Sequence, residues 1–265
     1  MDLIWNHWHG HPDVIIGLGL IESIYLVAVG PLRKRYNLSS TVQQLQVLSF
    51  TLGILVIFLS LLSPLHVLAD KYLFSAHMLQ HVLLTLVAPP LIVLGIPHWL
   101  IRPLLRPRLI FLIASVFTHP LVAFILFNAT FSIWHIPGLY NLSVTNHGIH
   151  IFEHLLFMGT ATCMWWPIFS TLDELPRLSY PLKMGYLFLL SLAQLIIFGP
   201  IAFSPDPIYQ WYSDAPRVWD FISVMTDQQL GAIIMKIGGA LIFISLIINT
   251  FFKWYSSEEK KHQLS

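Results

Sequence analysis

The stretch FSAHMLQHVLLTLVAPPLIVLGI, residues 74–96, is a continuous apolar run with two histidines near its start. A helix needs about 20 mostly apolar residues to cross the hydrocarbon core of a bilayer. The run meets that length, and it lacks the short alternating pattern of a barrel strand. It therefore predicts a membrane-spanning helix that carries His77 and His81 close to one membrane surface.

Six further segments have the same character, and together they predict an all-α, polytopic membrane protein. The seven predicted transmembrane helices cover residues 14–32, 45–62, 74–96, 109–131, 149–169, 184–203 and 230–252. We expect one seven-helix transmembrane domain over residues 1–265, with an outer arm at 1–13 and a cytoplasmic tail at 254–265. We also expect Pro89 and Pro90 to kink the third helix and Pro120 to bend the fourth.

Composition agrees with lipid as the main solvent. Of the 265 residues, 56% are apolar and only 10% are charged, whereas soluble domains carry about 25% charged residues. The net charge of +1 gives no case for binding nucleic acid. Cys163 is the single cysteine, which excludes an intrachain disulfide and argues against a thiolate metal site.

The lysines and arginines predict the orientation. Of the 14 such residues, 11 follow the first, third, fifth or seventh predicted helix, and these segments all lie on one side of the membrane. Two, Lys71 and Arg217, lie on the opposite side, and Lys236 lies within a helix. Since cytoplasmic loops are rich in Lys and Arg, we predict that the N-terminus is outside and the C-terminus is cytoplasmic.

Two pairs of histidines have metal-ligand spacing. His77 with His81, and His150 with His154, are four residues apart, so each pair lies on one helix face with Cβ atoms about 6 Å apart. Both pairs begin helices that run inward from the outer side. If these helices are neighbours, four imidazoles converge, and we predict that they bind one metal ion.

Other polar residues are expected on the same side. His66, His135 and His147 are further candidate ligands, and Asp70, Glu153 and Asp227 are expected to orient ligands or offset the charge of the ion. His7, His9 and His11 lie in the outer arm, where a metal-binding arm and a solvated arm both remain open. The aromatic residues Tyr209, Trp211, Tyr212 and Trp219 are expected to form an interfacial belt.

Imidazole ligands suit copper, zinc, iron and nickel. Without thiolates, the set favours Cu(II) or zinc over a cage specific for Cu(I). A haem b held by His81 and His154 is the alternative, since axial histidines on two helices at one depth are typical of membrane haem. The sequence HIFEH at 150–154 also matches the inverted zinc-protease motif. The predicted helix at 74–96 repeats this spacing, but Gln80 stands where the motif has its glutamate. We therefore expect paired ligands and no enzyme.

Two charges lie inside the predicted membrane region. Glu22 is in the middle of the first helix and Lys236 is in the middle of the last, at similar depths. An isolated charge in hydrocarbon is costly, so we predict an ion pair between these two helices.

Four motifs carry a family resemblance: HMLQHVLLTLVAPPLIVLG at 77–95, WHIPGLYN at 134–141, HIFEH at 150–154 and DQQLG at 227–231. In this order they resemble the CtaG family of assembly factors for bacterial caa3-type cytochrome c oxidase. The resemblance implies a seven-helix protein of the bacterial plasma membrane that assists oxidase maturation by handling copper on the outer side. It carries over to His77, His81, His135, His150, His154 and Asp227, while Lys236 has no place in it.

The sequence as a whole predicts a copper-binding assembly factor in the lipid bilayer that presents the ion to an oxidase subunit by ligand exchange. Two alternatives are a bis-histidine haem-b protein and a metal-free assembly scaffold. The oligomeric state stays open.

Overall fold

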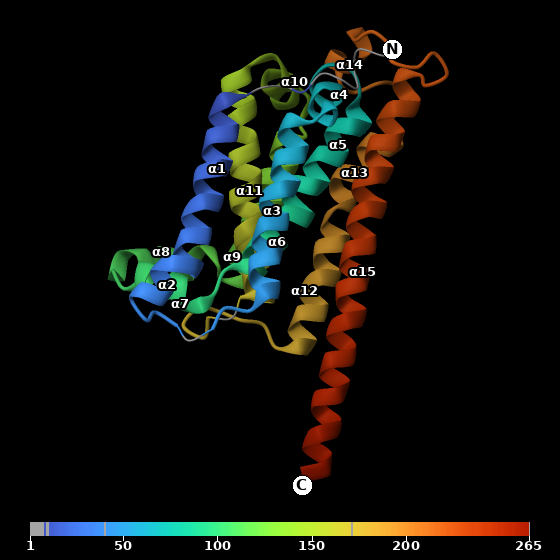
Figure 1. Cartoon of the computed structure of the whole chain (residues 1–265). Coiled ribbons are helices and arrows are strands. Elements are labelled where there is room, and N and C mark those ends of the chain that lie inside the picture. The colour runs from blue at the N-terminus through green and yellow to red at the C-terminus, as the bar shows by residue number, and fades with distance from the viewer. Residues whose placement is uncertain (1–7, 9–10, 40, 171, 265) are drawn as a thin grey trace.

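The computed structural model describes residues 8, 11–39, 41–170 and 172–264, and its regular structure there is entirely helical (Figure 1). The first half of the chain forms α1 (Pro12–Val27), η1 (Ala28–Leu32), α2 (Arg33–Arg35), α3 (Gln44–Leu62), α4 (Pro64–Lys71), α5 (Phe74–Val82), η2 (Leu83–Val87), α6 (Ala88–Gly95), α7 (His98–Ile101), η3 (Arg102–Leu105) and α8 (Arg108–Phe117). The second half forms α9 (Pro120–Trp134), α10 (Pro137–Thr145), α11 (His147–Phe169), α12 (Tyr180–Ala193), α13 (Leu195–Ala202), α14 (Gln210–Asp214) and α15 (Val224–Leu264). The predicted all-α fold is confirmed.

Five continuous helical stretches are long and apolar enough to cross a membrane: Pro12–Arg35, Gln44–Leu62, Phe74–Gly95, Tyr180–Ala202 and Val224–Gln263. The bent pair α8 and α9 makes a sixth if it is counted as one span. The helix α11 has 23 residues but is not among them. Because His150, Glu153 and His154 make its first half polar, its composition falls short although its length does not. The predicted count of seven is therefore not confirmed.

The segment expected as one span at 109–131 is two helices that meet at 66°. Pro120 begins α9, and the residue before it, His119, is extended (φ −62°, ψ 128°). Proline disfavours the helical conformation in the residue that precedes it. The predicted bend at Pro120 is thus confirmed, and it is sharp enough to interrupt the helix.

The span containing Pro89 and Pro90 includes a π-helical turn, η2, just before these prolines. Pro89 has no N–H to donate to the carbonyl of Thr85, four residues earlier. That carbonyl instead accepts a hydrogen bond from Trp165 Nε1 on α11 (2.8 Å). The carbonyl that lacks its helical partner therefore joins α11 to the span formed by α5, η2 and α6.

The largest apolar core lies among α5, α9, α11, α12, α13 and α15, with Trp165 and Phe243 fully buried. A smaller cluster joins α1, α3 and α6. There Tyr25 stacks on Phe50 at 3.8 Å between ring centroids and donates to the carbonyl of Gly95 (2.8 Å). Gly95 is essential to this contact, because a Cβ atom there would lie 2.5 Å from the backbone nitrogen of Phe50.

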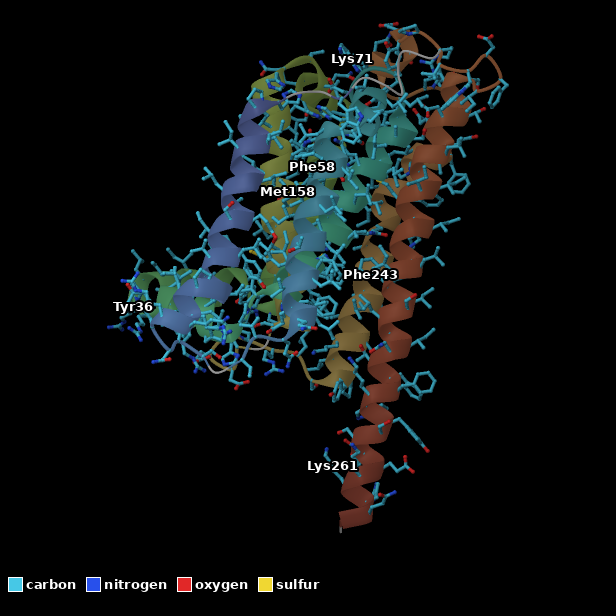
Figure 2. All side chains as sticks on the ribbon, in the orientation of Figure 1. Tyr36, Phe58, Lys71, Met158, Phe243 and Lys261 are labelled. Carbon is cyan, nitrogen blue, oxygen red and sulfur yellow. The ribbon has the colours of Figure 1, made fainter. Side chains whose placement is uncertain are left out.

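The two ends of the bundle differ in their short helices and in their charged residues. Lys71 and the short helices α4, α10 and α14 lie at one end, and Tyr36, α7, α8 and the C-terminal part of α15 lie at the other (Figures 1 and 2). The basic segment Arg33–Arg35, which forms α2, belongs to the second end. The separation agrees with the orientation expected from sequence, which stays a prediction.

The predicted ion pair between Glu22 and Lys236 is wrong. Glu22 accepts a hydrogen bond from Thr51 Oγ1 on α3 (2.6 Å), and Lys236 Nζ donates to the carbonyl of Ser191 on α12 (2.7 Å). The two charges share a depth, but α1 and α15 lie on opposite sides of the bundle (Figure 1). Each charged side chain therefore bonds to the helix beside it, although the second carboxylate oxygen of Glu22 has no partner among the described residues.

Candidate metal centre

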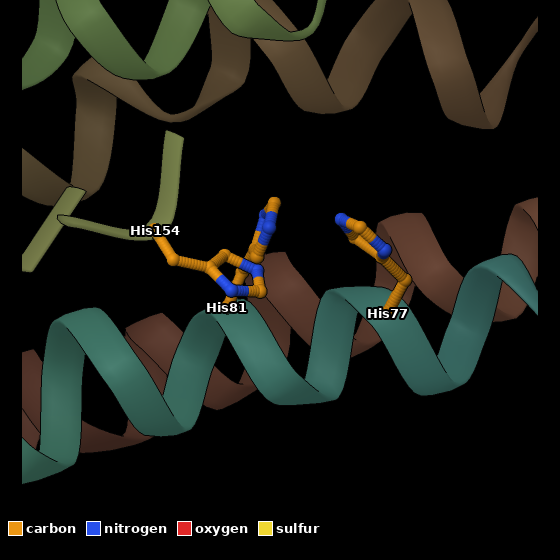
Figure 3. A group of neighbouring side chains, drawn as sticks. All are labelled: His77, His81 and His154. Carbon is orange, nitrogen blue, oxygen red and sulfur yellow. The ribbon is translucent and has the colours of Figure 1, made fainter. Parts of the chain in front are cut away.

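Three histidines from two helices converge inside the bundle. His77 and His81 extend from α5, and His154 reaches them from α11 (Figure 3). One ring nitrogen from each lies within 4.8 Å of the other two. The ring centroids of His77 and His81 are 4.3 Å apart, and those of His81 and His154 are 5.7 Å apart. We call these three residues the deep histidine group.

The deep group is buried and its nitrogens lack hydrogen-bond partners. His77 and His81 have exposed fractions of 0% and His154 of 5%. Among the described residues, neither ring nitrogen of His77 or His81 is bonded, nor is Nε2 of His154. A buried polar group without a partner costs about 1–3 kcal/mol. A bound cation would satisfy these nitrogen lone pairs and remove this cost. His77, His81 and His154 therefore fit a metal site.

Aromatic rings enclose the deep group. The ring of Phe157 lies 4.9 Å from that of His81, and the ring of Tyr140 lies 5.3 Å from that of His77, between centroids. Aromatic side chains thus form part of the wall around the imidazoles.

His135 lies beside the group as a fourth imidazole. Its Nδ1 is 2.6 Å from the carbonyl of Phe131, so Nδ1 carries the proton and donates. Its Nε2 therefore holds the lone pair, and it has no partner among the described residues. The His135 ring is 5.9 Å from that of His81. A backbone carbonyl that fixes the tautomer in this way is typical of metal-binding histidines.

His150 was expected in the deep set but lies at its edge. Its ring is 4.3 Å from that of His154 and 5.6 Å from that of His77. Its Nδ1 is 3.2 Å from Ser143 Oγ and 3.5 Å from a carboxylate oxygen of Glu153, while its Nε2 is 3.7 Å from Asp70. Ser143 in turn donates to Glu153. Glu153 and Asp70 thus place two carboxylates beside His150.

His66 and His147 are outside the deep group. His66 lies within 3.1 Å of the amide of Gln80, which also donates to the carbonyl of Ser60 (2.7 Å). His147 stacks on His11 with ring centroids 5.6 Å apart. His7 and His9 lie outside the described residues.

Asp227 has a different role from the one expected. Its carboxylate accepts hydrogen bonds from the backbone N–H groups of Phe74 (2.8 Å) and Ser75 (3.1 Å), at the first turn of α5. It therefore caps the helix that carries His77 and His81 and does not contact the imidazoles directly. In the same motif, Gly231 leaves room for the Phe74 ring, which a Cβ atom would approach to 2.4 Å. The DQQLG motif thus holds α15 against the start of α5.

Removing this cap should loosen the site. We expect Asp227→Ala to lower the free energy of unfolding by about 1–2 kcal/mol, because the first backbone donors of α5 lose their acceptor. Thermal unfolding in detergent measures this, with the exposed Asp220→Ala as the matched control. Equal melting temperatures for the two variants would contradict the capping role.

Three tyrosines were missed as part of this site. Tyr209 and Tyr212, expected in an interfacial belt, are instead buried at 2% and 1% exposure, so that expectation is wrong for them. Tyr140 donates to Tyr212 (3.1 Å), Tyr212 to the carbonyl of Ala69 (2.6 Å), and Tyr209 to the carbonyl of His135 (3.0 Å). Burial raises the pKa of Tyr140 and Tyr212 well above the ordinary value, so both remain hydrogen-bond donors. The one available signal was Tyr140, which lies within the WHIPGLYN motif.

Fold and site together define an all-helical protein with membrane-length apolar helices around a cluster of buried imidazoles. Residues 23–257 match the family described as cytochrome c oxidase caa3 assembly factor (Caa3_CtaG). The chain belongs to this family of oxidase assembly factors.

Similarity to individual proteins is more limited. Two uncharacterized proteins, Mb0105 of Mycobacterium bovis and MT0111 of Mycobacterium tuberculosis, are each 32% identical over 131 residues, which is 44% of this chain and 20% of theirs. The match therefore covers about a fifth of the length of these curated relatives. No solved structure matches.

Proposed function

We propose that this chain binds copper at the deep histidine group and passes it to a subunit of cytochrome c oxidase during assembly. The observation that carries the proposal is the convergence of three buried imidazoles, with ligand atoms within 4.8 Å and nitrogens that no described residue satisfies. Family membership supplies the oxidase as the target, and cytochrome c oxidase needs copper to function.

The donor set supports copper as the cargo. Imidazole binds both copper and zinc well, and we favour copper because the family is one of oxidase assembly factors. Thiolate does not contribute, because Cys163 lies nine residues beyond His154 on α11, about 14 Å along the helix axis. His135 supplies a further nitrogen as the ion enters or leaves.

Ligand exchange is the mechanism that these residues support. Neutral imidazoles hold the ion through lone pairs alone, and the nearest carboxylates, Glu153 and Asp70, lie beside His150 and outside the deep group. A partner that offers anionic ligands can therefore displace the imidazoles one at a time. No covalent bond is made or broken, so the proposed role is not enzymatic.

The Lys and Arg distribution supports a location in a bacterial plasma membrane with the histidine-bearing end outside. Copper would then be received and delivered at the outer surface, where this end opens. The oxidase subunit that accepts it would contact the same end.

The geometry favours a single ion over haem b. Ligand atoms of His81 and His154 lie within 4.8 Å of each other and of His77. The ring of Phe157 closes the remaining side of His81. A bis-histidine haem uses two axial imidazoles, whereas three imidazoles converge here, which supports a single coordinated ion.

Elemental analysis tests the proposal. We expect copper in purified wild-type protein and the loss of its tightly bound ion when His77, His81 and His154 are all alanine, whereas the exposed His98→Ala at the opposite end keeps that ion. A Soret band in place of copper would support the haem alternative. Full oxidase maturation with the triple variant would support a metal-free scaffold.

A further inference from the structure

A second set of histidines lies between the deep group and the surface. His11 at the start of α1, His66 on α4 and His147 at the start of α11 come from three separate elements. The His11 ring is 5.5 Å from that of His66 and 5.6 Å from that of His147, between centroids. We call these three residues the outer histidine group.

The two separations measured from His11 suit an ion that it shares with one neighbour. A metal–nitrogen bond of about 2.0–2.1 Å places each imidazole centre about 3 Å from the ion. Two rings on one ion therefore have centres up to about 6 Å apart. Both distances from His11 fall inside this limit, so His11 is placed to share an ion with either neighbour.

The outer group is continuous with the deep group. The His66 ring is 6.3 Å from that of His150, and the His150 ring is in turn 4.3 Å from that of His154. Burial increases along this series: His147 is exposed, His11 is half-buried, and His66, at 8% exposure, and the residues beyond it are buried. Neighbouring imidazole rings thus form a continuous series from the surface to the deep histidine group.

A cavity of about 610 Å³ follows the same route. Its lining includes His11, His66, His147, His150 and His154, together with apolar side chains of α1, α3, α6 and α11. Space is therefore present beside the histidines from the outer group to one ligand of the deep group.

Charge along this route favours a cation. Asp13 lines the cavity, and Asp70 lies 3.7 Å from Nε2 of His150. Lys71 follows Asp70 in the chain and is exposed. The two carboxylates lie at the cavity and at its central histidine, where they lower the cost of bringing in a positive ion.

We propose that the outer histidine group is a second metal site, which takes up a copper ion and passes it through His150 to the deep group. This inference rests on the proposed function of the deep group. The helix α1 supplies His11 and is the least buried of the five spans, with 11% of its apolar window inside the protein. Since few contacts hold this helix, His11 can move with the ion as it leaves the outer site.

Copper(II) chloride added to the purified full-length protein tests the inference, with binding counted by elemental analysis and electron paramagnetic resonance. We expect two ions on the wild type, one on His11→Ala/His147→Ala, and one weaker ion on His77→Ala/His81→Ala. Loading of the deep group at low copper should slow by about 10-fold or more in the outer variant, the size of effect seen when partners of a metal site are lost. His98→Ala is the matched control. His147 is exposed and His11 is only partly buried, and neither belongs to an apolar core cluster, so we expect their loss to leave the core intact.

Failure of the two proposals can be told apart. A wild type that binds one ion, with the outer variant loading at the wild-type rate, overturns the outer site and leaves the deep group standing. A wild type that binds no copper overturns both.

Discussion

Replacing His81 with leucine should abolish copper binding at the deep histidine group and raise the thermal stability of the metal-free protein. Both ring nitrogens of His81 are buried and without partners among the described residues. Leucine fills a comparable volume and brings no polar atom. Removing unsatisfied buried groups at about 1–3 kcal/mol each therefore stabilises the fold.

Copper binding should respond in the opposite direction. Losing a residue that only supports a ligand costs about 10–100-fold in metal affinity, so losing a ligand itself should exceed that. Isothermal titration with Cu(II) measures the affinity, and thermal unfolding without metal measures the stability. Copper should raise the unfolding temperature of the wild type, because a ligand that binds only the folded state stabilises it. It should raise that of His81→Leu by less, because only the outer histidine group remains to bind the ion.

The neighbouring Phe157→Leu is the matched control. Its ring packs on His81 and is 1% exposed, so this change should destabilise the fold while copper binding is retained. A structural histidine would behave like Phe157, with lower stability after substitution. That result for His81→Leu, or undiminished copper affinity, would contradict its assignment as a ligand.

Gly95→Ala should be strongly destabilising, although alanine usually favours helices by about 1 kcal/mol over glycine. A Cβ atom at Gly95 would lie 2.5, 2.6 and 2.7 Å from the backbone nitrogen, Cβ and Cα of Phe50. Backbone atoms cannot turn aside as a flexible side chain does, so α3 and α6 must separate. Overpacking of this kind costs about 1–3 kcal/mol or more.

The same separation would weaken the bond from Tyr25 to the Gly95 carbonyl and detach α1 from the bundle. Gly185→Ala on α12 is the control, because no atom lies within 4 Å of its added Cβ. We expect Gly185→Ala to be neutral or stabilising in thermal unfolding. Equal effects of the two substitutions would show that α3 and α6 are not closely packed at Gly95.

Much of the site followed from local spacing. The four-residue intervals in α5 and α11 place His77 with His81 and His150 with His154, and the structure brings these helices together. Spacing could not say which imidazoles share an ion, because that depends on how far one helix is shifted along the other. The shift brings His154 to the pair on α5 and leaves His150 beside Asp70 and Glu153.

Arrangement around the bundle was not available from sequence. Matched depth suggested that Glu22 and Lys236 pair, but depth does not tell which helices are neighbours. The capping by Asp227 was also hidden, since its partners, Phe74 and Ser75, are about 150 residues away in the chain. The predicted count of seven spans is not confirmed, partly because the polar site residues in α11 lower the mean hydropathy of that helix.

The break at Pro120 has a consequence for the surrounding lipid. With 15 residues, α9 is only about 22 Å long, which is less than the hydrocarbon thickness of about 30 Å. Only α8 and α9 together reach the length of a span. A helix as short as α9 matches a thinner hydrocarbon layer, and a mismatch costs a fraction of a kcal/mol per ångström. We therefore expect a neighbouring subunit with a similarly short hydrophobic helix to be favoured beside α9.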